Sequence, residues 1–356
     1  MTAEPGERSP NRTQHRVTIR EVARKAGVSV GTVSLALADS PAIAADTKVR
    51  VRDAATALHY RPSALGRALQ SRRTNAVALI VPHSSQHVFG HLYFMEVLSG
   101  VSEVLNSAGM TLVLSTTQSE IAEEEAYAKI LHSQMVDGVI LASAALNDKN
   151  IANLQMSSLP FVFIGRYPLD PGVQTVSITD EEGAHQAVRH LVWHGHTRIA
   201  HVSGPLAHLS AADRLAGYRA ALAEAGIEFR PEYCWEGDYS QEAGRAGTHA
   251  LLSLAEPPTA IFAANDDTAI GVADALRTAG RKPGIDFPIV GFDDVMFARL
   301  VDPPLTTVHQ PMRELGSAAA RLLLALLNGD MSTESLQVQL PTRLVIRSSC
   351  GCSDPL

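Results

Sequence analysis

Residues 17–60 contain three short stretches in which apolar positions recur at helical spacing. These positions are Val22, Ala23 and Ala26 in the first stretch, Val33 and Leu37 in the second, and Val51, Ala54, Ala55 and Leu58 in the third. Thr18 and Glu21 have the spacing of a capping box at a helix start. Gly27 can adopt the left-handed conformation that ends a helix, and Ser29 can cap the next one. We therefore predict three helices around one small core, with a tight turn between the first two, which is a helix-turn-helix domain.

After Arg73 the pattern changes to apolar runs of strand length that alternate with helical stretches. The runs are "AVALIV", "TLVLST", "GVILA", "FVFIG", "RIAHVSG", "AIFAAN" and "IVGFD". The helical stretches lie near 92–108, 120–133, 181–194, 211–225, 240–253 and 267–280. Apolar strands separated by helices are typical of parallel sheets covered on both faces. A series of this length predicts an α/β body with two lobes.

Charge divides the 356-residue chain into a basic beginning and an acidic remainder. Residues 1–75 hold 13 Lys and Arg against 6 Asp and Glu, whereas the remaining residues hold 17 against 31. A basic head on an acidic body indicates that the head meets a polyanion such as DNA. No apolar run approaches the roughly 20 residues that a bilayer span needs, and residues 1–16 have no apolar core of a signal peptide.

Three cysteines are too few for a disulfide framework, which is typical of a protein of the reducing cytosol. Cys350 and Cys352 form a C-x-C near the C-terminus, and we interpret this segment as an exposed tail. We assign no metal site and no cofactor.

Two other classes of protein fit the pattern less well. An enzyme is disfavoured because the chain has no G-x-S-x-G, no P-loop, no H-E-x-x-H and no helix-opening G-x-G-x-x-G. The acidic pairs Asp266/Asp267 and Asp293/Asp294 resemble a paired-carboxylate site, but a binding cleft also needs acceptors at strand ends. A transport-associated sugar-binding protein would need an export signal and would have no basic helix-turn-helix head.

Four stretches of the sequence resemble the LacI family of bacterial transcription regulators, which includes the lactose and purine repressors. The stretches are "VTIREVARKAGVSVGTVSLAL", "HYRPSALGRALQSRRTNAVALIVP", "IFAANDDTAIGVADALRTAG" and "IVGFDDVMFARLVDPPLTTVHQP". They occur in the family's order, and the likeness covers about Val17 to Arg347.

The resemblance implies a multidomain fold, with a small all-α helix-turn-helix head and an α/β body of two lobes, like type I periplasmic binding proteins. It implies a disordered arm (1–16), the head (17–61), a hinge helix and linker (62–74) and an effector-binding domain (75–350). Lobe 1 is expected at about 75–178 and 307–336, and lobe 2 at about 179–306 and 337–350. The chain would then cross between lobes near 178, 307 and 336.

The likeness also implies which residues contact DNA. The second helix would place Val30, Gly31 and Leu35 toward the major groove, where the family often has polar readers. Hydroxyl groups would hold phosphates, and Leu69 of the hinge would wedge into the minor groove. For Leu69 the alternative is an ordinary linker helix. The expected DNA-binding residues are Thr18, Ser29, Val30, Gly31, Thr32, Ser34, Leu35, Thr47, Arg67 and Leu69.

The family's ligand positions map onto polar and aromatic residues at strand and helix ends. Arg214 offers a planar set of donors, and Asp293 can accept from several hydroxyl groups. The two side chains could instead pair with each other, and each aromatic residue could instead be core. The expected effector-binding residues are Tyr93, Phe94, Ser210, Arg214, Tyr239, Asn265, Asp293 and Phe297.

The loop "HSSQHVFGHLYFMEVL" is longer than the family's common form and contains His83, His87 and His91. Their spacing would align them only on a continuous helix, which Gly90 argues against, so we expect no metal there. Asp180 is expected to cap the helix that follows it.

The sequence therefore predicts a cytoplasmic, nucleoid-associated regulator rather than an enzyme, most simply a repressor. Its expected partners are palindromic double-stranded operator DNA, a sugar or related effector, and a second copy of itself in a homodimer or higher assembly, with no membrane.

Overall fold

The computed structural model describes residues 17–60, 73–117, 127–131, 135–142, 145, 149–168, 170, 172–330 and 337–352. These residues belong to two compact units, one within residues 1–74 and the other within residues 75–356. Over the described ranges, no helix combines the length and the apolar character that a membrane span requires.

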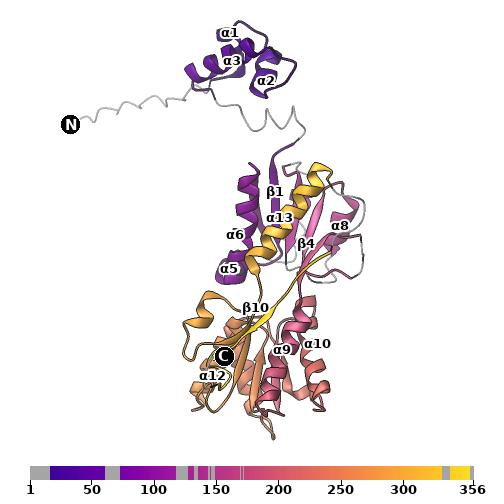
Figure 1. Cartoon of the computed structure of the whole chain (residues 1–356), viewed down its shortest axis with the longest axis vertical. Helices are drawn as coiled ribbons and strands as arrows, with labels where there is room; N and C mark the ends of the chain where they lie inside the picture. Colours follow the sequence, from indigo (N-terminus) through magenta and orange to yellow (C-terminus); the bar gives the residue numbers. More distant parts are fainter. Residues whose placement is uncertain are drawn as a thin grey trace, which may run out of the picture. The chain divides into compact units, whose positions relative to one another are not determined.

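The first unit contains the three predicted helices, α1 (Ile19–Ala26), α2 (Val30–Leu37) and α3 (Ala45–Ala57) (Figure 1). Gly27 adopts the left-handed conformation, with φ of 66°, and so ends α1 one residue before the turn. Each helix contributes one fully buried valine to a shared core, namely Val22, Val33 and Val51. The prediction of a helix-turn-helix head is confirmed.

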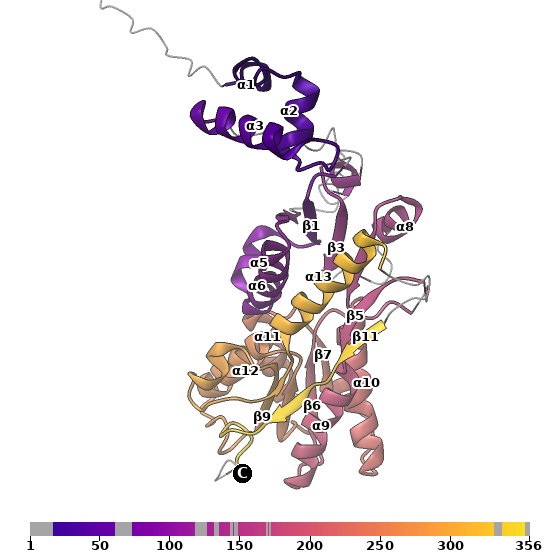
Figure 2. The same cartoon turned by 45° about the horizontal axis from the view of Figure 1, so that its top comes forward.

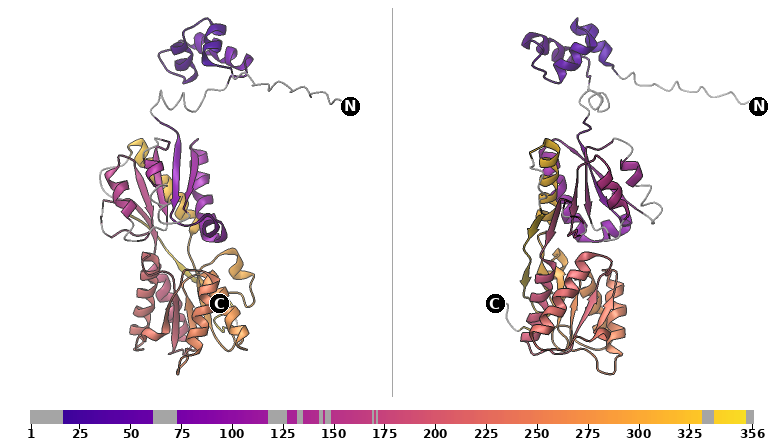
Figure 3. Two further views of the ribbon diagram at one scale, coloured as in Figure 1. Left: turned by 180° about the vertical axis from the view of Figure 1, so that it is seen from behind. Right: turned by 90° about the vertical axis from the view of Figure 1, so that its right-hand side faces the viewer.

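The first lobe of the body is a six-stranded parallel sheet in the order β11-β5-β4-β3-β1-β2. Its strands are β1 (Ala76–Val81), β2 (Thr111–Thr116), β3 (Gly138–Ala142), β4 (Phe161–Ile164), β5 (Thr175–Ile178) and β11 (Gln337–Leu340). Its helices are α5 (Ser85–Gly90), α6 (Leu92–Ser107), α8 (Lys149–Met156) and α13 (Met312–Asn328). Helices cover both faces of the sheet (Figure 3), as an apolar central strand such as β1, buried along its whole length, requires.

The second lobe is a six-stranded sheet in the order β12-β10-β9-β8-β6-β7, parallel except for β12. Its strands are β6 (Ile199–Ser203), β7 (Cys234–Glu236), β8 (Ala260–Ala263), β9 (Ile289–Asp293), β10 (Thr306–His309) and β12 (Arg343–Val345). Its helices are α9 (Asp180–Trp193), α10 (Leu209–Glu224), α11 (Gln241–Leu252), α12 (Asp266–Thr278) and the short 3₁₀ helices η1 (Pro231–Tyr233) and η2 (Met296–Arg299). The seven predicted strand runs are all strands, and the two-lobed α/β fold is confirmed.

The chain crosses between the lobes three times, and two of the crossings differ from the expectation. The first lies between β5 and α9, as expected near residue 178. The second follows β10, which stays in the second sheet, so it lies at 310–311 rather than near 307. The third lies at 341–342 rather than near 336, because β11 first adds to the edge of the first sheet beside β5. In Figure 2 the yellow segment runs from β11 in one lobe toward the other.

Two of these crossings are fastened to each other by threonine side chains. The hydroxyl groups of Thr179 and Thr342 lie 2.9 Å apart. The Thr342 backbone N–H donates to Thr179 Oγ1 at 2.9 Å, and its Oγ1 donates to the Thr179 carbonyl at 3.0 Å. The first and third connections between the lobes are therefore joined to each other by hydrogen bonds and form one hinge between the lobes, distinct from the hinge helix expected at 62–74.

Candidate DNA-binding face and effector cavity

Helix α2 buries one face and exposes two large apolar side chains on the other. Val33 and Ala36 are buried in the head core, whereas Val30 is 41% exposed and Leu35 is 37% exposed. A Cβ on Gly31 would meet only Ser29 Oγ, at 3.8 Å, so the surface beside Val30 is open. Apolar side chains exposed on the second helix of a helix-turn-helix domain can contact thymine methyl groups.

Hydroxyl groups gather at the start of α2. Ser29 Oγ accepts from the Thr32 backbone N–H at 3.1 Å and lies 2.8 Å from Thr32 Oγ1. Thr18 begins α1 as predicted, because its backbone N–H donates to Glu21 Oε2 at 2.7 Å. These caps hold the helix N-termini, whose amide groups and positive dipole ends favour phosphate.

The remaining expected DNA contacts divide between the helices and the hinge. Ser34 lies on α2 and Thr47 lies in the first turn of α3. Arg67 and Leu69 fall outside the described residues.

The body contains a cavity of about 300 Å³ at the carboxyl ends of strands from both lobes. Parallel α/β sheets commonly bind ligands at this edge. Seven of the eight expected effector residues line the cavity, namely Tyr93, Phe94, Ser210, Arg214, Tyr239, Asn265 and Asp293. Phe297 does not line it, because η2 carries this residue to the surface, where it is 47% exposed.

Arg214 occupies the centre of a buried charge network on one wall of the cavity. Its Nε donates to Asp180 Oδ1 at 2.8 Å, whereas its Nη1 lies 3.7 Å from Asp293 Oδ1. Its guanidinium carbon lies 3.7 Å from the centroid of the Phe292 ring. The main partner of Arg214 is therefore Asp180, and the direct pair with Asp293 is the weaker of the two.

The expectation that Asp180 caps the helix that follows it is wrong. It is the first residue of α9, and the N-cap position belongs to Thr179. Its carboxylate binds Arg214 and lines the cavity instead of capping the helix. The signal for this role was its place at the carboxyl end of a strand, but β5 was too short to be recognised.

The cavity wall carries more negative than positive charge. Burial raises the pKa of Asp293 to about 7, although Arg214 and a hydrogen bond from Gln310 oppose the shift. Burial also raises the pKa of Asp180, again against the effect of Arg214. Arg214 therefore does not fully offset the cost of burying these two carboxylates, and a ligand that donates hydrogen bonds to them would stabilise their charged forms.

The second lobe also contributes a tyrosine, a serine and an amide to the cavity lining. Tyr239 and Ser210 share a hydrogen bond between their hydroxyl groups at 3.1 Å. The Tyr239 ring lies so close to Gly204 that a Cβ there would come within 2.1 Å of it. Asn265 caps α12 through Oδ1 and donates from Nδ2 to the Tyr239 carbonyl at 3.1 Å. Asn265 thus holds the backbone of Tyr239 in place as well as facing the cavity.

Four histidines line the mouth of the cavity, and none of them was among the expected effector residues. The ring centroid of His87 lies 4.5 Å from that of His83 and 4.2 Å from that of His91. The ring of His208 stacks on that of His83, with centroids 5.7 Å apart. Burial, followed by the charge of His91, lowers the pKa of His87 to about 4, so its ring is neutral at pH 7. The residues come from separate segments, α5 and its flanks and the start of α10, which the sequence alone could not bring together.

Two polar contacts join the lobes across the cavity. Arg166, after β4, binds Asp213 of α10 through two hydrogen bonds, of 3.0 Å from Nε and 2.5 Å from Nη2. His91 Nδ1 lies 3.0 Å from Asp267 Oδ2. In each contact one side chain belongs to the first lobe and the other to the second, so both contacts depend on how the two lobes are arranged.

One carboxylate of each acidic pair that resembled an enzyme site is bound within the protein. Asp266 is buried and accepts from the Val295 backbone N–H at 2.8 Å and from the Thr307 hydroxyl group. Asp294 accepts from Arg347 Nη2 at 2.6 Å. These carboxylates support β9 and β10 rather than forming a pair in the cavity.

Comparison with known proteins identifies both units. Residues 18–63 match the model of bacterial regulatory proteins of the lacI family, and residues 188–350 match that of periplasmic binding protein-like domains. The HTH-type transcriptional regulator CelR of Thermobifida fusca is 36% identical, over 94% of this chain and 99% of that protein.

Solved structures agree over the same length. A complex of the transcriptional regulator CelR with cellobiose superposes with a TM-score of 0.75 at 34% identity, covering 94% of this chain and 100% of that one. The lac repressor dimer bound to operator and the anti-inducer ONPF gives a TM-score of 0.82 at 30% identity, covering 94% and 99%. With relatives that match along almost their whole length, the chain belongs to the LacI family of bacterial regulatory proteins and is a DNA-binding transcriptional regulator.

Proposed function

We propose that this regulator is a cytoplasmic repressor whose operator binding is controlled by a neutral sugar held in the 300 Å³ cavity. The observation that carries the proposal is the cavity wall, in which the carboxylates Asp180 and Asp293 flank a single buried guanidinium group. The protein binds this ligand without converting it.

The charge of the lining selects the ligand class. Four carboxylates (Asp180, Asp213, Asp238 and Asp293) face two guanidinium groups (Arg166 and Arg214). An excess of acceptors suits hydroxyl groups and repels phosphorylated or carboxylated ligands. The aromatic rings of Tyr93, Phe94 and Tyr239 provide flat faces for a sugar ring. The complex of the related CelR with cellobiose supports the same ligand class.

On the DNA side, we propose that α2 reads apolar base edges. Val30 and Leu35 are the exposed apolar side chains, and Gly31 lets the helix approach the bases closely. The hydroxyl groups of Thr18, Ser29, Thr32, Ser34 and Thr47 would hold phosphates and fix the register.

We further propose a homodimer on a palindromic operator, as in the lac repressor dimer bound to its operator. Arg67 and Leu69 would then act from the hinge, with Leu69 opening the central base step. A twofold assembly needs a twofold-related DNA site, so the half-sites should repeat with inverted orientation.

A thermal-shift screen of neutral sugars, polyols, nucleobases and sugar phosphates tests the ligand class, since a ligand that binds only the native state raises the melting temperature. We expect a neutral sugar to give the largest shift and its phosphate ester to give none. A sugar phosphate that shifted the melting temperature more than the parent sugar would contradict the charge argument.

Arg214→Ala tests the site. We expect it to abolish the effect of the identified sugar on operator binding in a gel-shift titration, while sugar-free operator affinity stays within about tenfold, or roughly 1.4 kcal/mol. Arg219→Ala is the matched control, because Arg219 lies on the same helix but is exposed and packs on Phe229. A normal sugar response in Arg214→Ala would place the effector elsewhere.

A further inference from the structure

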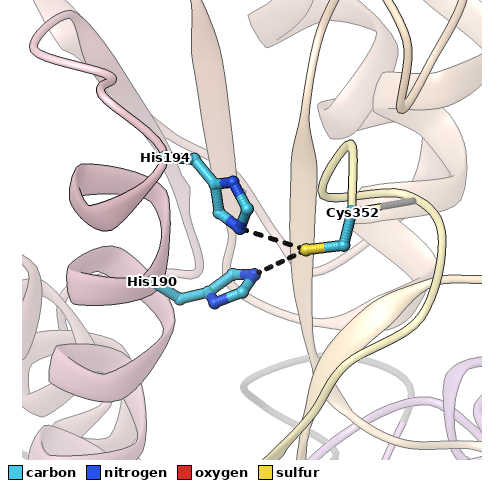
Figure 4. Close-up of side chains that lie close together, drawn as sticks. All are labelled: His190, His194 and Cys352. Atoms are coloured by element: carbon cyan, nitrogen blue, oxygen red, sulfur yellow. Dashed lines mark hydrogen bonds between the residues drawn. The ribbon is translucent and has the colours of Figure 1, made fainter. Parts of the chain in front are cut away.

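The last turn of α9 and the C-terminal tail bring two histidines and a cysteine together outside the effector cavity. His190 and His194 are separated by one helical turn, so their rings lie on the same side of α9. Cys352 Sγ lies 3.5 Å from His190 Nε2 and 3.1 Å from His194 Nε2 (Figure 4). All three ligand atoms lie within 4.8 Å of one another. Among the described residues, these are the three side chains that converge in this way.

The tail that delivers Cys352 is firmly attached to the second sheet. The Ser349 carbonyl accepts from the Ile289 backbone N–H at 2.7 Å, and Ser349 Oγ donates to the Ile289 carbonyl at 2.7 Å. Ser349 Oγ also accepts from the Thr306 backbone N–H at 2.8 Å, and Cys350 is buried. Cys352 therefore lies three residues beyond Ser349, whose hydrogen bonds fix the tail, so its position beside α9 is built into the fold.

The distances fit a tetrahedral metal ion. With Zn–S of about 2.3 Å and Zn–N of about 2.0–2.1 Å, tetrahedral geometry separates a sulfur and a nitrogen ligand by about 3.5 Å. The separation of Cys352 Sγ from His190 Nε2, 3.5 Å, matches this value, and that from His194 Nε2, 3.1 Å, is shorter and would have to widen by about 0.4 Å around the ion. Imidazole nitrogen with thiolate is a ligand set that suits Zn²⁺ and excludes Ca²⁺ and Mg²⁺, which take oxygen ligands.

We propose that His190, His194 and Cys352 bind one Zn²⁺ ion, which fastens the C-terminal tail to α9. The thiol of Cys352 loses its proton to solvent as the Zn–S bond forms. Three protein ligands leave the fourth position for water. The expectation that the C-x-C lies in an exposed tail is wrong, because Cys350 is buried and Cys352 is half-buried. The sequence could not show the site, because Cys352 lies 158 residues along the chain from His194.

Cys350 provides the competing explanation. Its Sγ lies 2.7 Å from Cys352 Sγ, so the two cysteines could instead form a disulfide under oxidising conditions. A disulfide would consume the thiolate that the metal needs. The two explanations make opposite predictions for the thiol content and for metal binding.

Trp193 offers a local reporter of the site. Its ring centroid lies 4.9 Å from that of His194 and 6.3 Å from that of His190, and the side chain is 73% exposed. The other tryptophan, Trp235, lies on β7 at the opposite edge of the second sheet from β12. Trp235→Phe therefore leaves Trp193 as the only tryptophan fluorophore.

The test uses full-length, tag-free protein, kept reduced, stripped of metal with a chelator and titrated with Co²⁺ and then with Zn²⁺. We expect one equivalent of Co²⁺ to give a thiolate charge-transfer band and tetrahedral d–d bands, to quench Trp193 and to be displaced by Zn²⁺. We also expect Zn²⁺ to raise the melting temperature. Cys352→Ser and His194→Asn should each weaken binding by about a hundredfold or more, as the loss of one of three ligands predicts.

Three variants serve as controls. Cys234→Ser removes a thiol on β7, His185→Asn removes a histidine of α9 that pairs with Glu224, and Cys350→Ser removes the neighbouring thiol. All three should bind Co²⁺ as the wild type does. The proposal is overturned if the charge-transfer band survives in Cys352→Ser, if Cys350→Ser weakens binding as much as Cys352→Ser, or if protein purified without reductant contains a Cys350–Cys352 disulfide and no zinc.

Discussion

His201 is a fully buried histidine of the second sheet. It lies on β6, its Nδ1 is 3.0 Å from the Phe262 carbonyl oxygen, and its ring stacks on Phe262 with centroids 4.8 Å apart. Its Nε2 is buried and has no hydrogen-bond partner among the described atoms. Burial lowers the pKa of His201 to about 4, although the hydrogen bond to the Phe262 carbonyl opposes the shift. The residue therefore folds as a neutral ring with Nδ1 as the donor.

We predict that this histidine makes the body less stable in mild acid. In the unfolded chain its pKa is about 6.5, so the unfolded state takes up the proton first as the pH falls. The contribution of His201 to the free energy of unfolding is complete above pH 6.5 and is lost between pH 6.5 and pH 4, by roughly 3 kcal/mol at most. His201→Gln, which keeps a donor but does not titrate, should show a smaller fall in the free energy of unfolding over this range.

Urea unfolding at several pH values measures this effect, with exposed His249→Gln as the control variant. The test does not depend on how stable His201→Gln is at a single pH, because it compares the slopes of the free energy of unfolding against pH. Equal slopes for the wild type and His201→Gln would show that another group controls the acid sensitivity.

At the scale of single residues, the sequence located most of the cavity through the family's motifs. Arg214 and Asp293 were expected there and line it. Asp180 and His87 were not expected, because an aspartate before a helix is equally typical of a cap, and the histidines of the segment 83–91 were considered only as metal ligands. Only the arrangement of the strand ends brings such side chains to one cavity.

At the scale of elements, α2 raises the question of how a helix with no charged side chain recognises DNA. Its exposed face carries Val30 and Leu35, with hydroxyl groups and N-terminal amides beside them. Such a helix has few side-chain hydrogen bonds to offer bases. Thymine methyl groups are the base features that remain for Val30 and Leu35 to contact.

We predict that thymine methyl groups carry part of the operator specificity. An operator selected from random DNA should contain thymines that, when replaced by uracil, cost about tenfold or more in affinity per operator. The slope of affinity against salt should not change, because phosphate contacts set it. Leu35→Ala should reduce the difference between thymine and uracil operators. Equal binding of both operators by the wild type would rule out apolar readout.

The strands were predictable where they were fully buried, whereas α13 was not among the expected helices although it has 17 residues. The runs that became β1, β3, β6, β8 and β9 are mostly apolar and are buried along their whole length, and the head helices show clear periodicity and caps. The strands β5, β7, β10, β11 and β12 have only three or four residues, too few for a period to be recognised. Of these, β11 has exposed positions alternating with half-buried ones, which is the pattern of an edge strand. Because β11 was not predicted, the third crossing between the lobes was expected too early in the chain.

At the scale of the whole body, the two lobes are held together by the hinge at Thr179 and Thr342 and by contacts across the cavity. Of these contacts, the one between Arg166 and Asp213 consists of two hydrogen bonds, whereas that between His91 and Asp267 has one short contact. The Arg166 side chain is 49% exposed, so solvent screening limits the contribution of the ion pair to about 1 kcal/mol or less. A contribution of this size can still shift an equilibrium between open and closed lobes several-fold.

We predict that the pair acts as a latch that favours the closed body. Arg166→Ala and Asp213→Ala should each weaken sugar binding by about two- to fivefold, as expected if the sugar binds the closed arrangement and the latch contributes up to about 1 kcal/mol to closure.

Because both residues also line the cavity, a direct contact with the sugar could produce the same loss. The double variant separates the two explanations. A latch is already broken by either single change, so the double variant should bind no more weakly than the single ones, whereas two independent sugar contacts would add. Operator affinity without sugar provides a second measurement, since a shift toward the open body must appear there as well if closure and DNA binding are coupled. Additive losses in sugar binding, together with unchanged operator affinity, would assign Arg166 and Asp213 to the sugar rather than to the closure of the lobes.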